Sequence, residues 1–172
     1  MSQPLVRLTY ASTATFQSDI KGGIESEVAR VLLESRRNNP KANLGGVLHF
    51  GNGYFFQCLE GPRDQVNRVY QKISQDTRHR NVQVLSTQSV DQRLFNDWSM
   101  KYLPLEENLS RLLKTHGQKA FDPYGLDDTT IDALLYACVN GVDPVAELGQ
   151  PSADQSDNAL TAWWKKLFQR RK

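Results

Sequence analysis

The sequence is poor in cysteine and has no long apolar run, and each absence argues against a class of protein. Only two cysteines occur among 172 residues, Cys58 and Cys138, and both lie in apolar stretches. This usage fits a reduced protein better than a disulfide-stabilised secreted domain. No run of about 18 apolar residues and no N-terminal signal pattern is present. We therefore expect a cytoplasmic protein.

Motifs for metal binding and hydrolysis are also missing. The sequence has no zinc-ligand spacing, no Ser-His-Asp order and no Gly-rich phosphate loop. Lysine and arginine total 21 against 19 acidic residues, a formal net charge of +2, which is too balanced to indicate a nucleic-acid partner. We expect neither a metal site nor an enzyme.

The most informative stretch that is present is residues 53–62, which follows an Asn-Gly pair typical of a two-residue hairpin turn. Alternation places Phe55, Gln57 and Leu59 on one face of a strand. The opposite face is also apolar, so the strand is expected to be central. An unpaired buried amide costs about 1–3 kcal/mol, so Gln57 needs a polar partner. The residues of the opposite face are Tyr54, Phe56 and Cys58.

The other elements follow from hydrophobic periodicity and turn signals. They are a strand over 5–10, a loop over 11–23, a helix from 24 to about 39, a strand over 45–50, a helix begun by 61–64 with proline at its first position, a strand near 82–90 and a last strand within 95–102. This order predicts an α+β, ferredoxin-like β-α-β-β-α-β-β sandwich with two helices on one sheet face. Helices near 105–115 and 128–140 are expected to cover the other face.

Several polar residues fall on otherwise apolar faces of these elements. Tyr10 ends a buried row of the first strand, and Ser35 and Asn39 share the apolar face of the first helix. If both helices lie on one sheet face, these groups converge with Gln57 on a slot between the helices. An apolar slot with a few polar edges suits a flat heteroaromatic ligand. Arg78 and His79 follow the second helix closely enough to join them.

The same residues carry a family resemblance from about residue 4 to 104. The motifs are Tyr10-Ala11-Ser12, Ser35-Arg36-Arg37-Asn38-Asn39, Leu44-Gly45-Gly46-Val47-Leu48, Phe55-Phe56-Gln57-Cys58-Leu59-Glu60-Gly61-Pro62, Asp76-Thr77-Arg78-His79 and Arg93-Leu94-Phe95-Asn96-Asp97-Trp98-Ser99-Met100. Together they resemble a BLUF domain, the blue-light sensor using flavin. Gly46 stands where this family usually has threonine, and the loop after Tyr10 is a few residues longer than usual.

The resemblance implies a non-enzymatic photoreceptor of the short BLUF type. Light would drive electron and proton transfer from Tyr10 through Gln57, and the rearranged Gln57 would shift flavin absorption to the red. Trp98 and Met100 would relay the change. The cofactor is expected to be FAD, with FMN as the alternative. The flavin-binding residues would be Ser35, Asn38, Asn39, Leu48, Phe55, Gln57, Ile73, Arg78 and His79.

We expect three segments. The resemblance implies a flavin-binding photosensor domain over 1–104, and the residue pattern after it predicts a helical extension over 105–149 that caps the sheet and a linker and tail over 150–172. The tail carries five basic residues and no acid over 159–172, beside an apolar stripe that includes Trp163 and Trp164. We expect a solvated or partner-packed amphipathic helix there, with peripheral membrane contact as the less favoured alternative. An unknown downstream protein and a homo-oligomer are the expected partners.

Each residue taken alone also has a purely structural explanation. Tyr10 could simply pack at the edge of the core, and Gln57 could form hydrogen bonds to the backbone. Arg78 could be a cation that interacts favourably with the negative end of the dipole of the second helix. A ferredoxin-like module for single-stranded nucleic acid, stacking bases on Tyr54 and Phe56, is the alternative function. A flavin oxidoreductase is a third, and the missing dinucleotide-binding motif argues against it.

Overall fold

The computed structural model describes residues 4–16, 26–96, 99–103, 113–114, 117 and 119–140. The element order β1-α1-β2-β3-α2-β4-β5 confirms the predicted α+β, ferredoxin-like arrangement. The elements are β1 Leu5–Ala14, α1 Ser26–Asn38, η1 Pro40–Ala42, β2 Gly45–Gly51, β3 Tyr54–Pro62, α2 Arg63–Ser74, β4 His79–Val90, β5 Lys101–Tyr102, η2 Pro123–Gly125 and α4 Asp128–Asn140.

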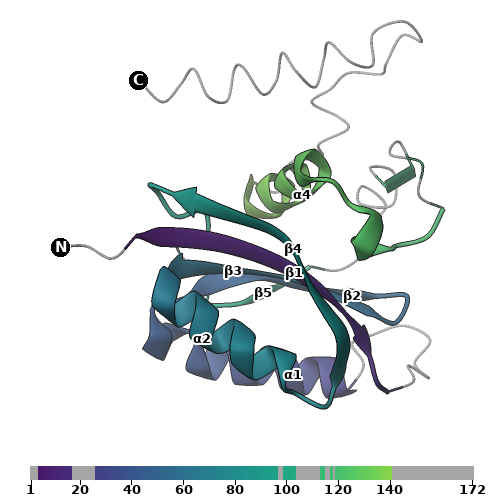
Figure 1. Cartoon of the computed structure of the whole chain (residues 1–172), viewed down its shortest axis with the longest axis horizontal. Coiled ribbons are helices and arrows are strands. Elements are labelled where there is room, and N and C mark those ends of the chain that lie inside the picture. Colours follow the sequence, from purple (N-terminus) through teal and green to yellow (C-terminus); the bar gives the residue numbers. More distant parts are fainter. Residues whose placement is uncertain are drawn as a thin grey trace, which may run out of the picture.

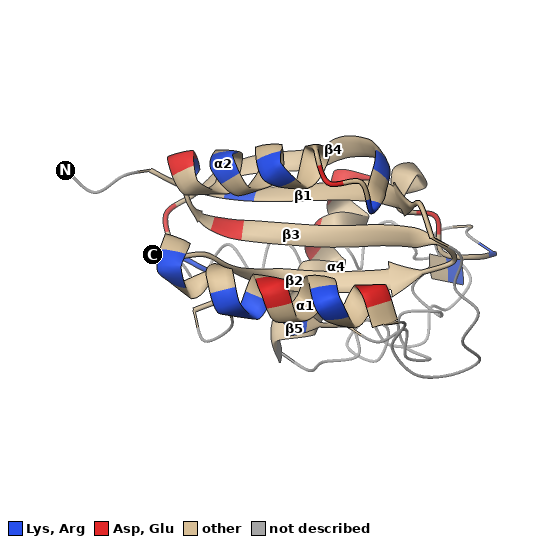
Figure 2. Ribbon diagram, turned by 90° about the horizontal axis from the view of Figure 1, so that it is seen from below, with Lys and Arg blue, Asp and Glu red and all other residues tan. Residues whose placement is uncertain are grey.

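The five strands form one sheet in the order β4-β1-β3-β2-β5. β3 pairs antiparallel with both β1 and β2, β4 pairs antiparallel with β1, and β5 pairs parallel with β2. Both α1 and α2 lie on one face of the sheet, and α4 lies on the other (Figure 1). Seen from the α1 and α2 side, the two helices lie side by side and run lengthwise along the strands (Figure 2). The central position expected for β3 is confirmed.

Alternation along β3 separates two hydrophobic cores. Phe55 and Leu59 belong to the core between the sheet and helices α1 and α2, and both are buried. Phe56 and Cys58 point the other way, into a core shared with α4. The helix expected over 128–140 is therefore confirmed and packs on the second sheet face. That core receives Ile131, Leu134, Leu135 and Cys138 from α4.

The turn between β2 and β3 has the backbone geometry that the Asn-Gly pair predicts. Asn52 and Gly53 both have positive φ, 53° and 78°. The helix start differs from expectation, because α2 begins at Arg63 and Pro62 precedes it with extended ψ of 131°. Pro62 still pairs with Leu5 in the sheet, which keeps it out of the first helical position.

Three strand boundaries also differ from expectation. β1 continues to Ala14 through residues predicted to be a loop, because they pair with the start of β3 on one side and with β4 on the other. β4 begins at His79 rather than near residue 82. The last strand is only Lys101–Tyr102, because its pairing with β2 covers two residues. The serine and threonine content of residues 11–14 indicated a loop, but backbone pairing with β3 and β4 makes this segment part of β1.

The predicted helix over 105–115 lies outside the described residues except for 113–114, and the 150–172 tail lies wholly outside them. The division into three segments stays a prediction. None of the helices within the described ranges is long and apolar enough to cross a membrane.

Candidate functional site

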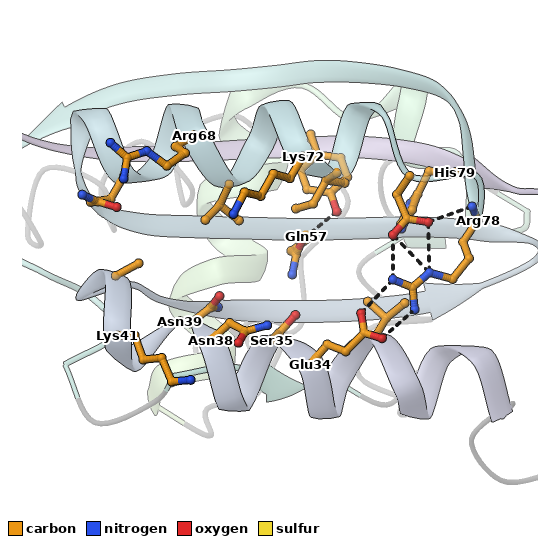
Figure 3. A pocket seen from close by; sticks show the side chains of 17 residues that line it. Glu34, Ser35, Asn38, Asn39, Lys41, Gln57, Arg68, Lys72, Arg78 and His79 are labelled. Atoms are coloured by element: carbon orange, nitrogen blue, oxygen red, sulfur yellow. Dashed lines mark hydrogen bonds and ion pairs between the residues drawn. The ribbon is translucent and has the colours of Figure 1, made fainter.

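A cavity of about 460 Å³ opens between α1 and α2, with β1 and β3 beneath it (Figure 3). Its walls come from helix positions spaced three or four residues apart, so one face of each helix borders it. The floor is formed by Tyr10 and Gln57. The other lining residues are Val31, Glu34, Ser35, Asn38, Asn39, Lys41 and Ala42 on the α1 side, Gln65, Arg68, Val69, Lys72 and Ile73 from α2, and Asp76, Arg78 and His79 at one end.

Tyr10 and Gln57 form the polar centre of the floor. They are register partners on β1 and β3, and the Tyr10 hydroxyl donates to Gln57 Oε1 at 2.5 Å. Both side chains are almost fully buried, at 0% and 1% exposed. Burial raises the pKa of Tyr10 far above its usual range, so the phenol keeps its proton across the whole physiological range. The polar partner that Gln57 required is therefore Tyr10.

The amide nitrogen of Gln57 points to the segment that enters β5. Gln57 Nε2 donates to Met100 Sδ at 3.5 Å. The same segment is bonded to the end of α1, since Arg36 Nε donates to the Met100 carbonyl at 3.0 Å and Asn39 Nδ2 donates to the Ser99 carbonyl at 2.9 Å. The connection into β5 is thus attached to both the floor and one wall of the cavity.

Charged side chains close one end of the cavity. Arg78 forms ion pairs with Asp76 at 2.6 Å and with Glu34 of α1 at 2.8 Å. The hydrogen bond from Arg78 lowers the pKa of Asp76. Because Glu34 lies on α1 and Arg78 follows α2, this network joins the two sides of the cavity (Figure 3).

His79 stands beside this network as the first residue of β4. Its Nδ1 lies 2.7 Å from Ser12 Oγ, and its ring packs 4.4 Å from the ring of Phe55, centroid to centroid. Burial lowers the pKa of His79 to about 4, so the imidazole is neutral at neutral pH. A neutral ring with one nitrogen engaged is a polar group that can border an uncharged ligand.

The predicted photoactive residues Tyr10 and Gln57 line the cavity. Most of the other predicted flavin-binding residues line it too: Ser35, Asn38, Asn39, Ile73, Arg78 and His79. Leu48 and Phe55 are not among the lining residues and lie in the core below. Met100, predicted as a relay, contacts Gln57. Trp98 lies outside the described residues. Contact of any of these residues with a flavin stays a prediction.

The polar face of α2 was not predicted from the sequence. Gln65, Arg68 and Lys72 line the cavity together with the predicted Ile73. Their spacing from Val69 and Ile73 follows a helical repeat, which could have identified them. With Lys41 on the opposite wall, they place cations along the cavity away from the Arg78 end (Figure 3). We call Lys41, Arg68 and Lys72 the cationic rim.

Comparison with known proteins identifies the family to which these motifs point. Residues 5–101 match the family model described as BLUF, sensors of blue-light using FAD. The photoactivated adenylate cyclase subunit beta of Euglena gracilis is 30% identical over 121 residues, which cover 64% of this chain and 14% of that protein. This chain therefore spans about a seventh of the cyclase relative's length.

Smaller relatives match a larger share of their own length. The solved ground state of BlsA superimposes with a TM-score of 0.71 at 32% identity, covering 79% of this chain and 88% of BlsA. The blue light- and temperature-regulated antirepressor BluF of Escherichia coli strain K12 is 37% identical over 79 residues, or 46% of this chain and 20% of BluF. These matches favour the light-sensor prediction over the nucleic-acid alternative.

Proposed function

This chain belongs to the BLUF family of sensors of blue light that use FAD, and we propose that it is a photoreceptor holding a flavin non-covalently between α1 and α2. The observation that carries the proposal is the hydrogen bond from buried Tyr10 to Gln57 on the floor of the cavity. It pairs a phenol with an amide whose nitrogen donates a second, weaker hydrogen bond to the thioether sulfur of Met100. Because one of its two hydrogen bonds is weak, the Gln57 amide can exchange its hydrogen-bond partners.

The donor set of the cavity fits a flavin ring. Val31, Val69 and Ile73 supply apolar walls, while Asn39 and Gln57 supply amide groups at its edge and floor. A flat heteroaromatic ring needs this combination of apolar faces and polar edges. A bound flavin supplies absorption of blue light and a ring that accepts electrons.

Tyr10 and Gln57 are the two residues of the chain that would move a proton and rearrange their hydrogen bonds. Tyr10 holds a proton at its hydroxyl oxygen and directs it at Gln57 Oε1. Rotation or tautomerisation of the Gln57 amide exchanges its donor and acceptor atoms, and this changes the hydrogen bonds that Gln57 offers to the cavity and to Met100. Because both side chains are buried, no solvent hydrogen bond competes with either arrangement.

We infer that the flavin is FAD rather than FMN. The cationic rim supports this proposal, because lysine and arginine bind phosphate oxygens through charge-assisted hydrogen bonds. The lysines and arginines of α1 and α2 are visible along both helices in Figure 2. FMN, with one phosphate, would engage fewer of these cations than the diphosphate of FAD.

Signalling to a downstream protein, within a homo-oligomer and in the cytoplasm, remains part of the proposal. The name of the antirepressor relative implies a protein target for that relative. The match to adenylate cyclases covers 14% of the relative, so we infer no cyclase activity. Base stacking on the sheet is not favoured, because Phe56 is 1% exposed and Tyr54 packs against Tyr124.

The experiment is the visible absorption spectrum of the purified protein, first in darkness and then after blue illumination. We expect a flavin band that moves to the red and returns in the dark. A flavin band without a reversible shift would contradict the photoreceptor proposal while keeping the binding site. No flavin, even after incubation with FAD, would contradict both.

A further inference from the structure

Met100, which precedes β5, and Lys101, the first residue of β5, reach opposite sides of the sheet. Met100 faces the helix-side core and contacts Gln57. Lys101 pairs with Val47, a member of the core below α4, and its Nζ donates to the Cys138 carbonyl of α4 at 3.0 Å. One peptide unit therefore separates the contact to the cavity floor from the contact to α4.

The Cys138 carbonyl lies in the last turn of α4, which ends at Asn140. The last carbonyls of a helix have no partner within the helix and carry the negative end of its dipole. An ammonium group is a favourable partner there, and Lys101 comes from a different element of the fold. The contact fastens the end of α4 to β5.

The main chain that positions Lys101 is itself held from the cavity side. Arg36 of α1 and Asn39, which follows α1, donate hydrogen bonds to the carbonyls of Met100 and Ser99, respectively. A change in the hydrogen bonds of Gln57 alters one of the contacts that fix Met100, and Lys101 is covalently next to it. Lys101 is therefore linked to the cavity floor through its neighbour Met100.

We propose that Lys101 is a positioning residue that holds the last turn of α4 in the dark and releases it when Gln57 rearranges, so that light exposes Cys138. The proposal rests on the photoreceptor function proposed above. The last turn of α4, which contains Cys138, is the region that would respond to light.

Cys138 supplies a direct readout of this release. Its side chain is 5% exposed, and Sγ donates to the Leu134 carbonyl at 2.8 Å within the helix. Burial raises the pKa of the Cys138 thiol to about 12, so alkylation requires local opening of α4. Cys58 is fully buried in β3 and serves as an internal reference in the same molecule.

The experiment measures iodoacetamide labelling of each cysteine by peptide mass spectrometry, in darkness and under continuous blue light, on the full-length flavin-loaded chain. We expect Cys138 to label about fivefold faster in the light, the scale set by losing one cation at a helix end. Cys58 should not respond. Tyr10→Phe in the light should label Cys138 at the dark rate.

Variants at Lys101 test the contact itself. Lys101→Met should label Cys138 rapidly in darkness and lose the light response, while its red shift persists. Lys101→Arg retains a cation and should restore the difference, and Lys119→Met removes an exposed lysine elsewhere and should behave as the wild type.

The outcomes distinguish failure of the Lys101 proposal from failure of the photoreceptor proposal. A wild-type protein with a normal red shift but equal Cys138 labelling in light and dark overturns the inference and leaves the photoreceptor function standing. A light response that survives in Lys101→Met overturns it as well. Absence of the red shift in the wild type overturns both. The wild-type comparison decides the question even if Lys101→Met does not fold.

Discussion

Tyr10 and Gln57 occupy opposing positions on neighbouring strands, and the phenol of one donates to the amide oxygen of the other at 2.5 Å. The pairing of β1 with β3 sets their separation, so the hydrogen bond is built by the sheet rather than by a mobile loop. Because Gln57 also donates to Met100 Sδ, its amide orientation is fixed by two partners. Changes at either residue should therefore be visible spectroscopically.

Tyr10→Phe should bind flavin and lose the light-induced red shift. The substitution keeps the ring volume but removes the transferable proton, and it leaves Gln57 Oε1 without this donor. An unpaired buried acceptor costs about 1–3 kcal/mol, so the free energy of unfolding should also fall. Light-minus-dark spectra and urea denaturation measure the two effects. Tyr54→Phe, on the opposite sheet face, is the control. A normal photocycle in Tyr10→Phe would remove Tyr10 from its proposed role.

Gln57→Leu should remain yellow and lose the red shift. Leucine has a similar size but offers neither an acceptor to Tyr10 nor a donor to Met100. Flavin affinity should fall by about fivefold to tenfold if one amide hydrogen bond to the ligand is lost, since such a bond contributes about 1 kcal/mol. Light-minus-dark spectra and a flavin titration provide the test, with exposed Gln71→Leu of α2 as the control. Retention of the shift would show that Gln57 is not the relay.

Neutralising the cationic rim should separate FAD from riboflavin. Arg68→Gln and Lys72→Gln remove charges that we expect to meet phosphate, and each exposed pair contributes up to about 1 kcal/mol. Each variant should therefore bind FAD about fivefold more weakly and riboflavin equally well. Fluorescence titration of both flavins compares them, with Arg30→Gln as a control outside the cavity. Equal losses for both flavins would contradict a phosphate contact.

The stability of the fold should fall in mild acid because of His79. Its pKa is about 4 in the folded protein, below the ordinary value of 6.5. Between these values the unfolded chain binds a proton that the folded chain does not, so stability is full above about pH 6.5 and is lost as the pH falls towards 4. From pH 7.5 to 5 the wild type should lose about 2 kcal/mol more than His79→Gln, since one pKa unit corresponds to about 1.4 kcal/mol. Urea denaturation at both pH values measures this difference. Parallel pH dependence of the two proteins would refute it.

Gly46→Ala should destabilise the fold even though it adds one methyl group. A Cβ at this position would collide with the carbonyl oxygen of Cys58 and would lie 3.3 Å from Met100 Cε. Because the obstacle is backbone of the neighbouring strand, β2 and β3 must move apart, at a cost of about 1–3 kcal/mol. Urea denaturation is the measurement. Gly53→Ala is the comparison, because its φ of 78° strains alanine without any collision. A Gly46→Ala protein as stable as the wild type would contradict the close approach.

Much of the fold was predictable because local rules and tertiary structure agree. The Asn52-Gly53 pair fixed a hairpin, and the alternation around Gln57 correctly indicated a strand buried on both faces. The polar partner required by Gln57 proved to be Tyr10, which ends a buried row in the sequence. Helical spacing also brought Ser35 and Asn39 to the cavity.

The remaining features depend on contacts between distant elements. The extension of β1 to Ala14 depends on its pairing partners, which composition does not reveal. Glu60 receives hydrogen bonds from the backbone nitrogens of Leu94 and Phe95 and an ion pair from Arg7, and no local pattern marks it. The role of Lys101 likewise depends on its hydrogen bond to α4, a distant element, and no local sequence pattern indicates that contact.

The two-sided burial of β3 has a consequence for how such a domain can diversify. Residues on the Gln57 face pack beneath the cavity and against α1 and α2, whereas Phe56 and Cys58 pack against the elements behind the sheet. Substitutions behind the sheet are therefore expected to leave the side chains around the cavity in place. The half of the sheet that bears the cavity can therefore be combined with different back layers, because the two cores are separate.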